Sequence, residues 1–105
     1  MCGIVGIGRL TSGGLFSMEV DAFENLLVAG MTRGMDGTGI VRVAKNGDAD
    51  WRKIKGTPVD LFRAPGIITW LSNASTACDK FLIGHNRFAS AVNKNNGNAH
   101  PFTRD

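Results

Sequence analysis

The sequence predicts a small α+β protein in which β-strands face a layer of helices. Short segments typical of β-strands lie near residue 5 and near residue 83, and apolar residues at helical spacing follow the first of them. The dipeptide Asn46-Gly47, which is typical of a hairpin turn, lies near the middle of the chain. The length of 105 residues is typical of one domain, and 43% hydrophobic with 20% charged residues is close to the globular average. We therefore expect one packed core and exclude a disordered or fibrous chain.

The first expected elements are a strand and a helix. Residues 2–10 place apolar side chains between glycines, which favours a short buried strand that other backbone approaches closely. Apolar residues at helical spacing follow, and acidic residues occupy the first turns, where they suit the helix dipole. This pattern predicts a helix over residues 18–32, with its apolar positions at Val20, Phe23, Leu26, Leu27 and Met31.

A β-hairpin is expected in the middle of the chain. Residues 40–45 alternate in character, Asn46-Gly47 is typical of a tight hairpin turn, and residues 51–55 supply the returning strand. The returning strand carries the densest basic group of the sequence, which is Arg52, Lys53 and Lys55 beside Trp51. We interpret this group as a solvated strand face, and phosphate binding is the alternative.

Two short helices and a second buried strand are expected after the hairpin. Proline favours the first turn of a helix, so Pro58 can open a helix that ends at residue 62, and Pro65 one that ends at about residue 71. A polar loop over residues 72–79 then leads into a strand over residues 81–85.

Charge and cysteine content exclude several classes of function. The net charge is +3, but the 12 basic residues are spread along the whole chain, so we expect no nucleic-acid partner. No apolar run approaches a membrane span and the N-terminus does not resemble a signal peptide, so we expect no membrane partner and a cytoplasmic location. Two cysteines are too few for a disulfide framework. Cysteines and histidines lack the paired short spacing of a zinc site, so we expect no metal and no other cofactor.

Cys2 is the strongest candidate for chemistry. Its plain interpretation is a small buried hydrophobe at the start of a strand. Removal of Met1 would instead leave a thiol and a free α-amine on the same residue. The ordinary pKa of an α-amine, about 8, suits it to accept the thiol proton near neutral pH. Cys2 could then serve as nucleophile and base together.

Four blocks of the sequence resemble one family. They are Met-Cys-Gly-Ile-Val-Gly-Ile at 1–7, Arg-Gly-Met-Asp-Gly-Thr-Gly at 33–39, Gly-His-Asn-Arg-Phe-Ala-Ser at 84–90 and Asn-Ala-His-Pro-Phe at 98–102. In this order they are similar to the class II glutamine amidotransferase domains, which are N-terminal-nucleophile (Ntn) hydrolases. The resemblance implies part of a four-layer αββα sandwich with antiparallel sheets. It also implies hydrolysis of the glutamine side-chain amide, with ammonia delivered to an acceptor that the sequence does not identify.

The resemblance implies a role for each matching residue. Cys2 would be the nucleophile that forms a glutamyl thioester, and Arg87 would bind the glutamine α-carboxylate with its guanidinium group. Ser90 would offer a hydroxyl to the substrate at a position where the family commonly has threonine. Supporting rather than chemical roles fall to Gly3, Arg33, Asp36, His85 and His100.

The resemblance further implies partners and a boundary. In the family, the last block precedes an Asn-Gly pair that forms the oxyanion hole and an acidic residue that binds the substrate amine, and Asp105 is reached before either. We therefore expect residues 1–105 to be a single domain shortened at its C-terminal side. A synthase domain or a second chain would supply the acceptor site and the oxyanion segment. The alternative is a binding or regulatory module that keeps the fold without catalysis.

Overall fold

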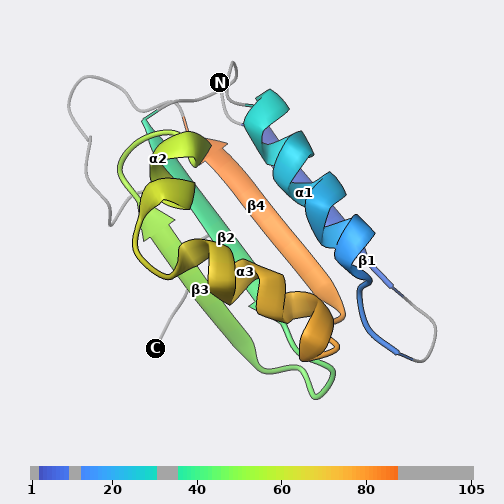
Figure 1. The fold of residues 1–105 in the computed structure, drawn as a ribbon. Coiled ribbons are helices and arrows are strands. Elements are labelled where there is room, and N and C mark those ends of the chain that lie inside the picture. Colours follow the sequence, from blue (N-terminus) through green and yellow to red (C-terminus); the bar gives the residue numbers. More distant parts are fainter. Residues whose placement is uncertain (1–2, 10–12, 31–35, 88–105) are drawn as a thin grey trace.

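The protein is built on one antiparallel sheet that carries its helices on one face (Figure 1). The computed structural model describes residues 3–9, 13–30 and 36–87. The strand order is β1-β4-β2-β3, so β4 lies inside the sheet although it is the last described strand along the chain. The elements are β1 (Gly3–Gly8), α1 (Ser17–Ala29), β2 (Gly37–Val43), β3 (Ala49–Ile54), α2 (Pro58–Arg63), α3 (Ile67–Thr76) and β4 (Phe81–Arg87).

Register is set by one local turn and two long-range pairings. The hairpin of β2 and β3 turns at Asn46-Gly47, where Gly47 adopts a φ of +94° that favours glycine. β4 pairs antiparallel with both β1 and β2. Among the described strands, β4 alone therefore joins β1 to the hairpin.

The core lies between the helices and the sheet. α1 and α3 pack against each other and against the strands with a stripe of buried apolar side chains. A Cβ atom added at Gly84 would lie 2.8 Å from Leu27 Cδ1 and 2.9 Å from Phe23 Cζ, so the bare backbone of β4 lets α1 approach. The largest buried members of the core are Leu15, Phe23, Leu27, Ile40, Leu61, Leu71 and Leu82.

Comparison with the expected elements confirms the α+β class, the hairpin, the strands near residues 5 and 83 and the helix that Pro58 opens. The burial predicted for the first strand is wrong, because β1 lies at the edge of the described sheet and only Gly3 of it is buried. The loop predicted over residues 72–79 is wrong, because α3 continues to Thr76. Leu71 and Ala74 extend the buried stripe begun by Ile67 and Trp70, and this burial outweighs the polar residues between them. The described ranges form one sheet and one helical layer, so the coarse class is established without the four-layer sandwich.

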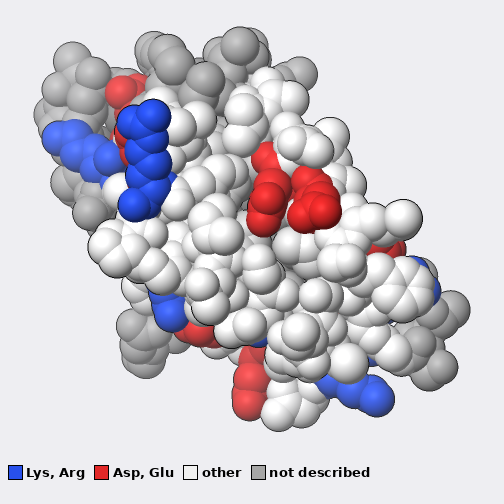
Figure 2. Space-filling model, viewed as in Figure 1, with Lys and Arg blue, Asp and Glu red and all other residues white. Residues whose placement is uncertain are grey.

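The surface on the helical side is largely uncharged, with a group of acidic side chains over α1 (Figure 2). The acidic residues of this helix are Glu19, Asp21 and Glu24. Within the ranges that the structure describes, no helix has both the length and the apolar character needed to cross a membrane.

Candidate functional site

Three of the four sequence blocks meet at one end of the sheet. Gly3, at the start of β1, pairs with Asn86 on β4. On the other side of β4, Gly37 pairs with Arg87, and the Asp36 N–H donates to the Arg87 carbonyl oxygen at 2.8 Å. Sheet pairing thus places Gly3, Asp36 and Arg87 on three adjacent segments.

His85 and Arg87 occupy the face of β4 that is opposite to α1. Asn86, between them, points the other way, because its side-chain amide donates to the carbonyl of Leu27 in α1 at 3.0 Å. Side chains alternate along a strand, so the neighbours of Asn86 lie on the opposite face. His85 is only 7% exposed and stands between Ile4 of β1 and Gly39 of β2.

Hydrogen bonds after β3 hold the same end of the sheet in place. The Gly56 N–H donates to the Asp36 carbonyl at 3.2 Å, and the Thr38 hydroxyl donates to the Gly56 carbonyl at 2.9 Å. Asp36 therefore contributes main-chain contacts to both Arg87 and Gly56. The supporting role expected for Asp36 in catalysis stays a prediction.

The remaining predicted site residues lie outside the described ranges. They are Cys2, Arg33, Ser90 and His100. Cys2 directly precedes β1 in the sequence, and Ser90 follows the last residue of β4 by three positions. Their roles stay predictions.

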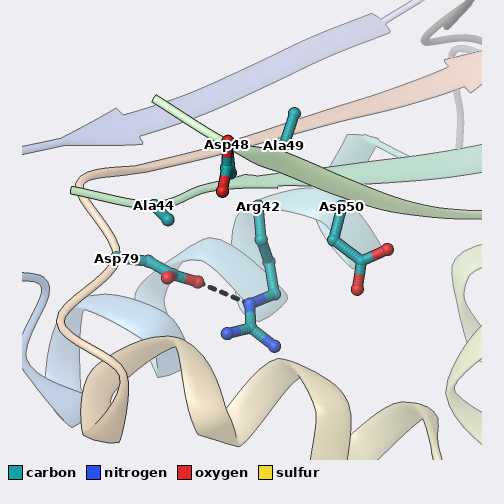
Figure 3. Close-up of a pocket in the computed structure, with 6 residues that line it drawn as sticks. All are labelled: Arg42, Ala44, Asp48, Ala49, Asp50 and Asp79. Atoms are coloured by element: carbon teal, nitrogen blue, oxygen red, sulfur yellow. Dashed lines mark hydrogen bonds and ion pairs between the residues drawn. The ribbon is translucent and has the colours of Figure 1, made fainter. Parts of the chain in front are cut away.

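A separate cavity of about 140 Å³ lies between the hairpin and α3 (Figure 3). It is lined by Arg42, Ala44, Asp48, Ala49, Asp50 and Asp79. Arg42 reaches from β2 toward the helix, pairs with Asp79 through Nε and donates from Nη1 to the Trp70 carbonyl at 2.7 Å. The Trp70 indole N–H donates to Asp50 at 2.7 Å.

The polar side chains around this cavity are better suited to stabilising the fold than to binding a substrate. The carboxylates of Asp50 and Asp79 already accept hydrogen bonds from protein donors. Desolvation opposes the ionisation of Asp50, but hydrogen bonds from Trp70 and Arg52 outweigh it and hold the pKa of that carboxyl below its ordinary value. Sequence reasoning missed the network because Arg42 and Asp79 are 37 positions apart. The available signal was a charged residue in a strand beside the core residue Ile40.

Comparison with known proteins gives a fold relationship and corrects the family assignment. No protein-family model and no curated protein matches the chain. A chain in the solved complex of beta-clamp processivity factor and little finger domain of PolIV is similar, with a TM-score of 0.52 and 8% sequence identity over 87% of this chain and 93% of that chain. The expected membership of the class II glutamine amidotransferase family is contradicted by these findings. What they establish is a small α+β fold that this chain shares with a chain of the clamp and little finger complex.

Proposed function

We propose that this chain is a thiol-dependent hydrolase of the glutamine side-chain amide, with Cys2 as nucleophile and Arg87 as the anchor of the substrate α-carboxylate. The observation that supports the proposal is the convergence of Gly3, Asp36 and Arg87 at one sheet end. Gly3 directly follows the proposed nucleophile in the sequence. The proposal rests on this placement and on thiol chemistry, and it assumes no family membership.

The proposed reaction balances with groups that the chain carries. The thiolate of Cys2 attacks the amide carbon, the C–N bond breaks, and the proton taken up by the α-amine passes to the leaving ammonia. Water then attacks the thioester, releases glutamate and restores the thiol. Because the α-amine must be free, the working protein is expected to lack Met1.

Arg87 suits the role of a carboxylate anchor by charge, shape and position. Its planar guanidinium can donate two parallel hydrogen bonds to a carboxylate. It ends β4, is partly buried and lies on the face of β4 that is opposite to α1. We include the finer fold in the proposal: a second sheet would pack on that face, complete a four-layer sandwich and supply the oxyanion donors.

The release of ammonia and glutamate from glutamine tests this function. Glutamine labelled with ¹⁵N in its side chain, followed by NMR, is expected to release ammonia in equimolar amount to glutamate when the segment that supplies the oxyanion donors is present. Cys2→Ala is expected to abolish release. Cys78→Ala is the matched control, since Cys78 is an exposed free thiol at the end of α3 and is expected to leave turnover unchanged.

A covalent probe separates chemistry from binding in the chain as it stands. A glutamine analogue with an electrophilic side-chain terminus is expected to add once to the protein, at Cys2 and not at Cys78. Intact mass must also show the loss of Met1. Equal labelling of both thiols, labelling that survives Arg87→Ala unchanged, or complete retention of Met1 would each contradict the mechanism.

The second candidate is a binding module that lacks catalysis. The observation that favours it is the fold relationship, since the similar chain belongs to a complex between a clamp and a little finger domain. Under this alternative, glutamine neither binds nor is cleaved. Calorimetry with glutamine discriminates the two, because only the hydrolase predicts binding that Arg87→Ala removes.

A further inference from the structure

β1 forms one edge of the sheet, and its outward main-chain groups can be identified. The Arg9 N–H donates to the Lys80 carbonyl at 3.0 Å, which turns the main chain of Arg9 toward β4. Main-chain groups alternate in direction along an antiparallel strand, so those of Ile4, Gly6 and Gly8 point away from β4. No other strand of the described ranges lies on that side.

The β1 edge lacks the features that usually prevent strands from pairing between molecules. Its sequence, Gly-Ile-Val-Gly-Ile-Gly, contains no charge and no proline. The opposite edge, β3, carries Asp50, Arg52 and Lys53. Beside β1, α1 also presents Leu26, which is 51% exposed and two turns beyond Glu19, the partner of Arg9.

We propose that β1 pairs antiparallel with β1 of a second copy of this chain, about a two-fold axis through Gly6. The hydrogen-bonded pairs would be Gly6 with Gly6 of the partner subunit and Ile4 with Gly8 of the partner subunit. This proposal is independent of the proposed hydrolase function. It is an isologous contact, which closes at two subunits.

The side chains of this register complement each other. Ile4 is 76% exposed in the single chain. The space above Gly8 is filled by the Phe81 ring, since a Cβ there would lie 2.4 Å from Phe81 Cδ1, and Phe81 is 37% exposed. In the pair, Ile4 of each copy would rest against Phe81 of the other. The edge carries no charged side chain, so two copies of a chain with a net charge of +3 can pair there without bringing cations together.

Sedimentation equilibrium of the full chain tests the pairing. From low to high micromolar concentration, the wild type is expected to form a dimer. Ile4→Lys places two charges in the seam and is expected to weaken dimerisation about 100-fold or more. Ile68→Lys is the matched control, because Ile68 lies on α3 and is 49% exposed, and it is expected to leave the dimer intact. Circular dichroism verifies that each variant is folded.

Two further variants test the pairing if Ile4→Lys fails to fold. Gly6→Pro removes an outward N–H without breaking a bond to β4, and a Cβ at Gly6 meets only the Leu82 carbonyl at 3.8 Å, so this variant is expected to be monomeric. Gly6→Cys, with Cys2 and Cys78 changed to serine, is expected to be captured as a dimer by a short bismaleimide. A monomeric wild type, equal effects of Ile4→Lys and Ile68→Lys, or a dimer that the cross-linker does not capture would overturn the proposal.

Discussion

The two halves of the helix–sheet interface are held by different interactions. Beneath α1, Phe23 and Leu27 pack on the bare backbone of Gly84, and the buried Asn86 amide adds one hydrogen bond to the Leu27 carbonyl. Beneath α3, Arg42 and Asp79 form an ion pair whose side chains are 13% and 3% exposed. The stability of the α1 half depends mainly on the packing of apolar side chains, and that of the α3 half depends on keeping two buried charges together. The predictions below use this difference, in order of expected effect.

Phe23→Ala is expected to cost about 3–5 kcal/mol of unfolding free energy, because it empties a fully buried position beneath α1. Urea denaturation at neutral pH measures the loss. Met18→Ala, at a 73% exposed position of the same helix, is the control and is expected to change stability by less than about 0.5 kcal/mol. A loss below about 1 kcal/mol for Phe23→Ala would show that this half does not depend on packed volume.

Asp79→Ala is expected to cost about 3 kcal/mol, because it leaves the Arg42 guanidinium buried without its carboxylate. The double variant Arg42→Met with Asp79→Leu removes both charges and is expected to recover most of the loss. Urea denaturation of the single and double variants completes the cycle. Additive losses in the double variant would mean that the two residues act separately, contrary to the ion-pair account.

Cys78→Gly is expected to stabilise the protein by about 1 kcal/mol, since Cys78 adopts the left-handed conformation at φ +59° that favours glycine. The cap itself is kept, because the Asp79 N–H donates to the Ala74 carbonyl at 2.9 Å whichever residue stands at 78. Thermal unfolding measures the gain, and Cys78→Ala, which retains the strain, is the control. Equal melting temperatures for the two variants would contradict the backbone explanation.

Glu24→Gln is expected to give the smallest effect, a gain of less than about 0.5 kcal/mol at pH 7. Desolvation, followed by repulsion from Asp21, raises the pKa of Glu24 above its ordinary value of 4.5. A raised folded-state pKa favours the protonated acid, so the stability it provides is present at acid pH and is lost as the pH rises through the folded-state pKa. The advantage of glutamine should therefore disappear near pH 4. A gain that is independent of pH would exclude ionisation as its cause.

The features that the sequence predicted well are those with local causes. Asn46-Gly47 is enough to place the hairpin turn, and the helical spacing of Val20, Phe23 and Leu27 predicts α1 within three residues of its observed end. The predicted end of α3 was wrong because Ser72 and Asn73 are typical of loops, whereas the burial of Ala74 depends on tertiary contact. Local propensity could not reveal that contact.

The candidate site was predictable as a set of segments but not as a geometry. The blocks that contain Gly3, Asp36 and Arg87 were identified separately, and only strand pairing shows that they adjoin. The Arg42–Asp79 network was missed because no local pattern links the two residues. The resemblance of the blocks to one family led to a family assignment that the comparisons contradict, although the segments themselves do meet.

The interior position of β4 has a consequence for synthesis of the protein on the ribosome. β1 emerges first, yet its described partner strand begins at Phe81, so β1 and the hairpin cannot join into one sheet until more than seventy further residues have been translated. At about 5–20 residues per second, the nascent strand would wait several seconds with both edges unpaired. An apolar strand in that state is a ready target for chaperones, and β4 acts as the late segment whose arrival closes the sheet.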